Sequence, residues 1–204
     1  MKFTIIKEPI PYLIIDRTYT IEEQVQIYSE LDFLVDKLQG PEHTYSAIDR
    51  SGNIKKNRGI FLEDFYKDLN FSNIFKCNRK LFNKEIIDVL HQCHPAYSLV
   101  NNINFDSNLL SYYDDGGSYF SHKDSAIVSM VTWFFKEPKN FEGGDFKFTD
   151  YNLEVEVKNN RTVIFFSSYK HEVSEVKIKD KSIHASGRFT LSNFSLIDPA
   201  RVNK

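Results

Sequence analysis

The pattern of apolar and polar residues changes near Pro95. Before that position, two segments repeat apolar side chains at helical spacing. The first helix is expected over residues 21–38 with Thr20 as its N-cap, and its apolar face should consist of Ile21, Val25, Tyr28, Leu31 and Leu34. The second helix is expected over residues 72–92, because Pro95 closes that pattern. Between the helices, residues 50–61 are polar, basic and glycine-containing, which predicts a mobile loop and, secondarily, a substrate lid.

After residue 95 the pattern turns to short β runs bounded by turn residues. There are eight of them: YSLVNNINF, NLLSYY, AIVSMVTWFF, GDFKFT, NLEVEV, TVIFFS, EVSEVKI and FTLSNFSLI. The pair Asn159-Asn160 predicts a hairpin turn between two of these runs. Eight strands at this spacing predict a closed barrel or a two-sheet jelly roll, with the amino-terminal helices packed outside.

The expected organisation is therefore mainly β with some α. Residues 1–204 should form a single domain, a size that can bury a sizeable core. Within it we expect a helical annex with a first strand over residues 1–95, and a β core over residues 96–198.

Composition narrows the choice of partners. The formal net charge is -2, so we expect neither nucleic acid nor an anionic membrane as a partner, and no acidic or basic groove is evident that would select a charged polymer. The aromatic content of 15% suits either an all-β core or an aromatic-lined pocket.

Two features suggest where the protein is located. The amino-terminal apolar stretch is too short and too interrupted to be a secretory signal or a membrane span. The only cysteines, Cys77 and Cys93, form neither a disulfide framework nor a CxxC pair, which favours a reducing compartment. We expect a cytoplasmic protein.

The candidate chemistry lies around the stretch SYFSHKD. His122 and Asp124 stand two positions apart, so in an extended strand their side chains would share one face, about 7 Å apart. Of the six histidines, His171 differs in following the strongly apolar run TVIFFSSYK. Each of these residues alone would be read as a turn residue. Together, two imidazoles and one carboxylate match the facial triad of non-haem Fe(II) sites, with other coordination positions open.

Four motifs in order carry a family resemblance: YDDGGSYFSHKD, FEGGDFKF, SSYKHEVSEV and GRFTLSNF. Over residues 98–196 the chain resembles the 2-oxoglutarate- and Fe(II)-dependent dioxygenases, most closely the prolyl 4-hydroxylase-like branch. The resemblance implies a double-stranded β-helix core of the jelly-roll or cupin type. It also implies that His122, Asp124 and His171 are catalytic residues that bind iron.

The resemblance assigns the cosubstrate as well. Arg188 would pair with the C5 carboxylate of 2-oxoglutarate, for which a guanidinium fork is suited, and Tyr113 would donate a hydrogen bond near the C1 end. Lys181 follows His171 by ten positions, the family's usual interval, whereas Arg188 follows by seventeen, so Lys181 competes for the role. We favour Arg188 because GRFTLSNF supplies the strand, with VKIKDKSIHAS as an enlarged hairpin.

One position departs from some relatives. They place a tyrosine where this chain has Trp133, and an indole cannot take over every function of a phenol. Thr132 and Thr190 are the candidate substitutes in this part of the pocket.

By resemblance, the expected enzyme is a dioxygenase that hydroxylates an unactivated C–H bond and decarboxylates 2-oxoglutarate to succinate and CO2. It would need Fe(II), 2-oxoglutarate and O2, with ascorbate as a further candidate. The leading substrate is a prolyl or other peptidyl residue of a peptide or protein. The intact HxD motif favours hydroxylation over halogenation. The alternatives are the same chemistry on a free amino acid, small metabolite or nucleobase, and a non-catalytic cupin-like binding module.

Overall fold

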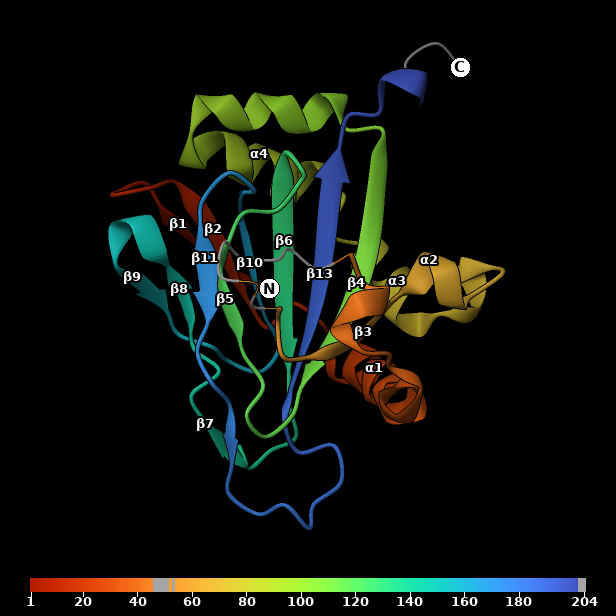
Figure 1. Cartoon of the computed structure of the whole chain (residues 1–204). Helices are drawn as coiled ribbons and strands as arrows, with labels where there is room; N and C mark the ends of the chain where they lie inside the picture. The colour runs from red at the N-terminus through yellow and green to blue at the C-terminus, as the bar shows by residue number, and fades with distance from the viewer. Residues whose placement is uncertain (46–51, 53, 202–204) are drawn as a thin grey trace.

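Seven antiparallel strands form the larger of two packed sheets in the computed structural model (Figure 1), which describes residues 1–45, 52 and 54–201. Their order is β1-β2-β10-β6-β13-β4-β3. The bounds are Lys2–Ile6 (β1), Tyr12–Asp16 (β2), Arg58–Phe61 (β3), Phe105–Tyr113 (β4), Val128–Phe134 (β6), Arg161–Phe166 (β10) and Arg188–Leu196 (β13). Successive side chains of each strand point to opposite faces, so the sheet has two different surfaces to cover.

A smaller sheet covers one of these surfaces. Its order is β5-β11-β8-β9, with bounds Tyr119–His122 (β5), His171–Val173 (β11), Phe146–Phe148 (β8) and Leu153–Val155 (β9). A short pair of strands, Phe141–Glu142 (β7) and Lys177–Ile178 (β12), extends from this layer. The two sheets share an aromatic-rich core that includes Trp133, Phe165, Phe146 and Phe148. This sandwich is the predicted jelly roll.

Helices contribute to the core on the opposite surface of the larger sheet. They are Ile21–Leu34 (α1), Leu62–Phe65 (α2), Asn73–Arg79 (α3) and Lys84–Cys93 (α4), with short 3-10 turns at Val35–Lys37, Pro41–His43, Leu69–Phe71, Pro95–Asn102, Thr149–Tyr151 and Pro199–Arg201. One apolar cluster joins the helices to the sheet, and its members include Leu31, Ile74, Leu90, Leu110 and Leu191. Within the described residues, no helix is long and apolar enough to span a bilayer.

The first helix begins as predicted but presents a different face. Thr20 and Glu23 form a reciprocal capping box at its start. The buried apolar side chains are Ile27, Leu31 and Leu34, whereas Ile21 and Val25 are 76% and 66% exposed. The predicted apolar face was therefore wrong over its first turns, because the spacing from Ile27 onward, and not from Ile21, faces the sheet.

The second predicted helix is two helices. It breaks after Arg79, and Asn83 accepts a hydrogen bond from the backbone N–H of Ile86 to begin α4. The predicted strand YSLVNNINF was also wrong over its first part. Pro95 starts a 3-10 helix there, and the His94 ring accepts a hydrogen bond from the N–H of Ala96.

Asn159-Asn160 forms a turn but not a hairpin. β9 before it pairs with β8 in the smaller sheet, while β10 after it pairs with β2 and β6 in the larger one. Asn160 takes a left-handed φ of 59°, and its amide exchanges two hydrogen bonds with the backbone of Tyr19. The turn therefore carries the chain from one sheet to the other. Likewise, β12 pairs with β7 and not with β13, so the predicted enlarged hairpin before Arg188 is a connection.

The amino-terminal part contributes more strand than expected. β1, β2 and β3 all belong to the larger sheet, where the sequence suggested one strand before residue 95. Residues 58–61, placed in the predicted loop, form β3 and pair with β4. The rest of that prediction falls partly on residues 46–51 and 53, which lie outside the described residues.

Candidate active site

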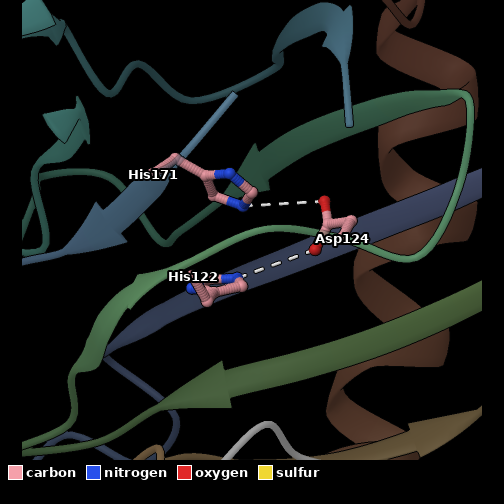
Figure 2. A group of neighbouring side chains, drawn as sticks. All are labelled: His122, Asp124 and His171. Carbon is pink, nitrogen blue, oxygen red and sulfur yellow. Dashed lines mark ion pairs between the residues drawn. The ribbon is translucent and has the colours of Figure 1, made fainter. Parts of the chain in front are cut away.

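Three side chains that are distant in sequence meet between the two sheets. His122 is the last residue of β5 and His171 the first of β11, and the antiparallel register places them directly opposite each other. Asp124 lies just beyond β5, where its backbone N–H donates to the carbonyl of Ser167 at 3.1 Å. Figure 2 shows the three side chains pointing toward one common centre. The structure thus brings His122, Asp124 and His171 together, although Asp124 is in a loop and not in the strand.

The distances suit a shared metal ion. One candidate ligand atom from each residue lies within 4.8 Å of the others. The Nε2 atoms of His122 and His171 are each 3.6 Å from an Asp124 carboxylate oxygen. These separations exceed hydrogen-bond distance, and an ion bound about 2 Å from each atom would bridge them.

A second layer of hydrogen bonds fixes the orientation of the imidazoles. The Nδ1 of His122 donates to the carbonyl of Phe120 at 2.8 Å, and the Nδ1 of His171 donates to the carbonyl of Tyr169 at 3.0 Å. Because a carbonyl only accepts, each Nδ1 carries a proton, and both Nε2 atoms are directed toward Asp124.

The carboxylate is oriented in the same way. The hydroxyl of Ser129 donates to Oδ2 of Asp124 at 2.6 Å and lies 2.8 Å from the hydroxyl of Ser167. Oδ1 is left as the less engaged oxygen. Ser129 and Ser167 have no local sequence pattern that distinguishes them from other serines in or next to strands.

Electrostatics keep the site ready for a cation. Burial, together with the nearby His171, lowers the pKa of His122 to about 3. The imidazole is therefore neutral at pH 7, the form that can donate a lone pair to a metal.

A cavity of about 440 Å³ continues from the triad to Arg188. The Arg188 side chain is fully buried, and its carbon Cζ lies 5.1 Å and 5.5 Å from the ring centroids of Tyr113 and Trp133. None of its three guanidinium nitrogens has a hydrogen-bond partner among the described residues, and the same is true of Trp133 Nε1 and Thr190 Oγ1. Buried polar atoms are rarely left without partners, so this end of the cavity fits an anionic group with several acceptor oxygens.

Lys181 and Arg188, the two alternatives for the same carboxylate, lie in different parts of the structure. Lys181 lies on the surface with its side chain 70% exposed and pairs with Asp115 at 2.5 Å, away from the cavity. Tyr113 lines the cavity; burial raises the pKa of its phenol, and the Arg188 charge opposes that rise. Arg188, and not Lys181, therefore lines the cavity that holds the triad.

The two threonines, Thr190 and Thr132, lie on opposite faces of the larger sheet. Thr190 faces the cavity, whereas the Thr132 hydroxyl lies 2.6 Å from that of Thr162, on the helix side of the sheet. The cavity side of β6 is instead occupied by Trp133 and Val131. Thr132 is thus not the substitute for a tyrosine in this pocket.

Two further residues lie at the site without a role assigned to them from the sequence. The ring of Tyr119 stacks on that of His122, with centroids 3.6 Å apart. Lys55, which the sequence placed in a solvated loop, is 3% exposed and lines the same cavity. Lys55 stands beside Lys56 in a basic run, and no local sequence signal separates the buried lysine from a solvated one.

Comparison with known proteins agrees with this geometry. Residues 108–194 match the family model of the 2OG-Fe(II) oxygenase superfamily. No curated protein matches the chain. Among solved structures, a Pseudomonas putida prolyl-4-hydroxylase is similar at 14% identity and a TM-score of 0.63, covering 92% of each chain.

Two other solved structures are similar in fold. A Trichoplax adhaerens prolyl hydroxylase in complex with a hypoxia inducible factor peptide aligns at 12% identity and a TM-score of 0.62, over 95% of this chain and 86% of that one. NgTET1 in complex with 5mC DNA aligns at 14% identity and a TM-score of 0.54, over 94% and 74%. The predicted resemblance and the double-stranded β-helix fold are confirmed.

Proposed function

We propose, on the premise that residues 108–194 belong to the 2OG-Fe(II) oxygenase superfamily, that this protein hydroxylates an unactivated C–H bond. The observation that carries the proposal is the triad itself. Two imidazoles and one carboxylate converge within 4.8 Å, at one end of a cavity whose other end holds a buried guanidinium with no hydrogen-bond partner among the described residues.

His122, Asp124 and His171 would hold Fe(II), and Arg188 would bind the far carboxylate of 2-oxoglutarate. When bound, the iron and 2-oxoglutarate supply an oxidation by O2 that yields succinate, CO2 and a hydroxylated product. Tyr113 faces the same cavity and is placed to donate a hydrogen bond to the cosubstrate.

The chain's own residues orient these groups and keep water out. The two Nδ1 hydrogen bonds hold the imidazole rings, and Ser129 holds one oxygen of Asp124. Apolar side chains line much of the remaining wall, including Leu109, Val131, Phe146 and Val173. A dry cavity strengthens the pairing between Arg188 and a carboxylate.

The leading substrate is a prolyl residue in a peptide. Two of the similar structures are prolyl hydroxylases, and one of them holds a peptide. The outer part of the cavity supports this choice, because the half-buried side chains of β4 and β13 that line it combine apolar and small polar groups, namely Phe105, Ser107, Ser192, Phe194 and Leu196. A nucleobase is the second candidate, favoured by the similarity to NgTET1.

The test is O2-dependent formation of succinate from 2-oxoglutarate with Fe(II), measured with and without proline-containing peptides. His122→Ala and Asp124→Ala should lose bound iron and turnover, while the matched control His184→Ala, at an exposed position, should keep both. Unchanged iron stoichiometry in both triad variants would refute the assignment. A non-catalytic cupin-like module would bind metal without consuming 2-oxoglutarate.

We also propose a cytoplasmic location, a single domain and an accessory role for ascorbate. These proposals rest on the cysteine content, the length of the chain and the family resemblance, respectively. Cell fractionation, cooperative unfolding and ascorbate-dependent turnover test them one by one.

A further inference from the structure

Lys55 is a buried cation that the proposed chemistry does not use. Its neighbour Lys56 exchanges two backbone hydrogen bonds with Ser118, at 2.8 and 2.9 Å, which ties this part of the chain to the segment before β5. The Lys55 ammonium lies 3.5 Å from the carbonyl oxygen of Thr44 and 5.5 Å from the centroid of the Tyr119 ring. Since that ring stacks on His122, one aromatic ring lies between the ammonium and a candidate metal ligand.

The charges around the cavity do not balance. Its described lining residues include three basic side chains, Lys55, Lys123 and Arg188, but only one acid, Asp124. In the part of the chain that the structure describes, no carboxylate lies within ion-pair distance of Lys55.

If iron and 2-oxoglutarate were bound, the positive charge of Lys55 would still be uncompensated. The two positive charges of Fe(II) and the single charge of Arg188 are offset by Asp124 and the two carboxylates of 2-oxoglutarate. Lys55 then remains as a buried ammonium with no counter-ion among the described residues. A buried charge without a partner is costly, so the filled site favours one more anion.

We propose that Lys55 binds a carboxylate of the substrate, so that the enzyme prefers proline compounds that carry a carboxylate on the proline itself or on the adjacent residue. This inference rests on the proposed function and names its substrate class. The carboxylate is either a free main-chain carboxylate or an acidic side chain in a peptide. Both would accept hydrogen bonds from an ammonium that is held in place by Thr44 and Tyr119.

A carboxylate fits better than a nucleic-acid backbone. Binding of a polyanion rests on many exposed lysines and arginines, each neutralising one phosphate. Here Lys55 is buried, Lys123 is the exposed cation among the described lining residues, and the chain carries a net charge of -2. Burial lowers the pKa of Lys55 to about 8 and Asp124 opposes the shift, so the amine is mainly protonated at pH 7.

The experiment compares matched ligands by calorimetry, using the full chain with Mn(II) and 2-oxoglutarate in the absence of O2. N-acetylproline against N-acetylprolinamide tests a main-chain carboxylate. Acetyl-Pro-Asp-amide against acetyl-Pro-Asn-amide tests an acidic side chain. In at least one pair, we expect the acid to bind about tenfold more tightly than the amide.

Substitutions of Lys55 test whether its ammonium causes the preference for acids over amides. Lys55→Met should abolish the tenfold difference, whereas Lys55→Arg should keep most of it and Lys158→Met, at an exposed position, should keep all of it. The KM for 2-oxoglutarate should change by less than about twofold in Lys55→Met, because Arg188 and not Lys55 binds the cosubstrate. Thermal unfolding verifies that each variant is folded, and Lys55→Arg preserves the test if Lys55→Met is not.

Each other result overturns the inference. It fails if no acid in the panel binds, if acids and amides bind equally, or if the preference survives Lys55→Met. It fails as well if Lys55→Met raises the KM for 2-oxoglutarate, or if a single-stranded oligonucleotide binds more tightly than the acids in a Lys55-dependent way. The proposed function is tested separately, because it fails when wild-type protein with Fe(II) and O2 forms no succinate, whatever the panel binds.

Discussion

Along β13, the two faces of the larger sheet differ in how far the buried polar side chains of the strand find partners. On the helix side, the Asn193 amide donates to Asp106 at 2.6 Å and to Asn108 at 3.0 Å, and Asn78 donates to Asn108 at 2.9 Å. On the cavity side of the same strand, Arg188 and Thr190 keep buried atoms that have no partner among the described residues. Along β13, the side chain of Asn193 on one face is hydrogen-bonded, whereas Arg188 and Thr190 on the other face keep polar atoms without hydrogen bonds among the described residues.

This difference separates structural roles from functional ones. A closed hydrogen-bond network stabilises the fold, and breaking it leaves a buried group without its partner. A buried group that starts without a partner costs stability and is retained where a ligand supplies the missing bonds. Substitutions on the helix side should therefore change stability, and substitutions on the cavity side should change binding and turnover.

The largest effect is expected at the carboxylate of the triad. Asp124→Asn keeps the volume of the side chain but removes its charge, so we expect iron binding and 2-oxoglutarate turnover to fall by more than about 100-fold. The free energy of unfolding without metal should change by less than about 1 kcal/mol. Metal content, succinate formation and urea unfolding measure the three quantities. If Asp124→Asn lowered stability but kept its iron, the cavity side would have the structural role that we expect only of the helix side.

The next effect is expected at the far end of the cavity. Arg188→Met should raise the KM for 2-oxoglutarate by about 30-fold or more, because a charged pair worth about 2 kcal/mol or more is lost. Without ligand, the variant should be as stable as the wild type or more stable, since an unpaired buried guanidinium is gone. Steady-state kinetics and urea unfolding give the two values. Lys181→Met is the matched control and should leave KM unchanged, because Lys181 is exposed.

On the helix side the expectation is reversed. Asn193→Ala removes the donor to Asp106 and Asn108 and should lower the free energy of unfolding by about 1–3 kcal/mol. The KM for 2-oxoglutarate should stay within about twofold of the wild type, because the side chain points away from the cavity. Equilibrium unfolding in urea measures the free energy of unfolding, and kinetics at a temperature well below unfolding measure the KM for 2-oxoglutarate. A KM that rises as steeply as in Arg188→Met would show that the two faces are not independent.

The sequence predicted the triad better than its surroundings. His122, Asp124 and His171 stand in motifs whose order survives even where the strands around them were misplaced, as at YSLVNNINF. The choice between Arg188 and Lys181 could not be made from spacing. It depends on the connection after β12, which leaves Lys181 on the surface and returns the chain to the cavity at Arg188.

Other misses have the same physical origin. Ile21 and Val25 are as apolar as Ile27, and only the packing of α1 against the sheet decides which of them is buried. Lys55 lies in a basic run that reads as solvated, and its burial depends on the pairing of Lys56 with Ser118, which is 62 positions away. Local sequence does not encode such distant pairings.

The smallest effect is a pH dependence that tests the cation near the triad. With a pKa of about 8, Lys55 is cationic at pH 7 and mostly neutral at pH 9. The preference for an acid over its amide should therefore be constant below about pH 7. Between pH 7 and pH 9 it should decrease, by no more than about tenfold. The neighbouring groups do not produce this change: the pKa of His122 is lowered to about 3, and that of Arg188 is lowered by burial only to about 10. Calorimetry of the N-acetylproline pair at several pH values measures the effect. Lys55→Arg should flatten the curve over this range, because a guanidinium stays charged throughout, and a fall that persists in this variant would assign the titration to another group.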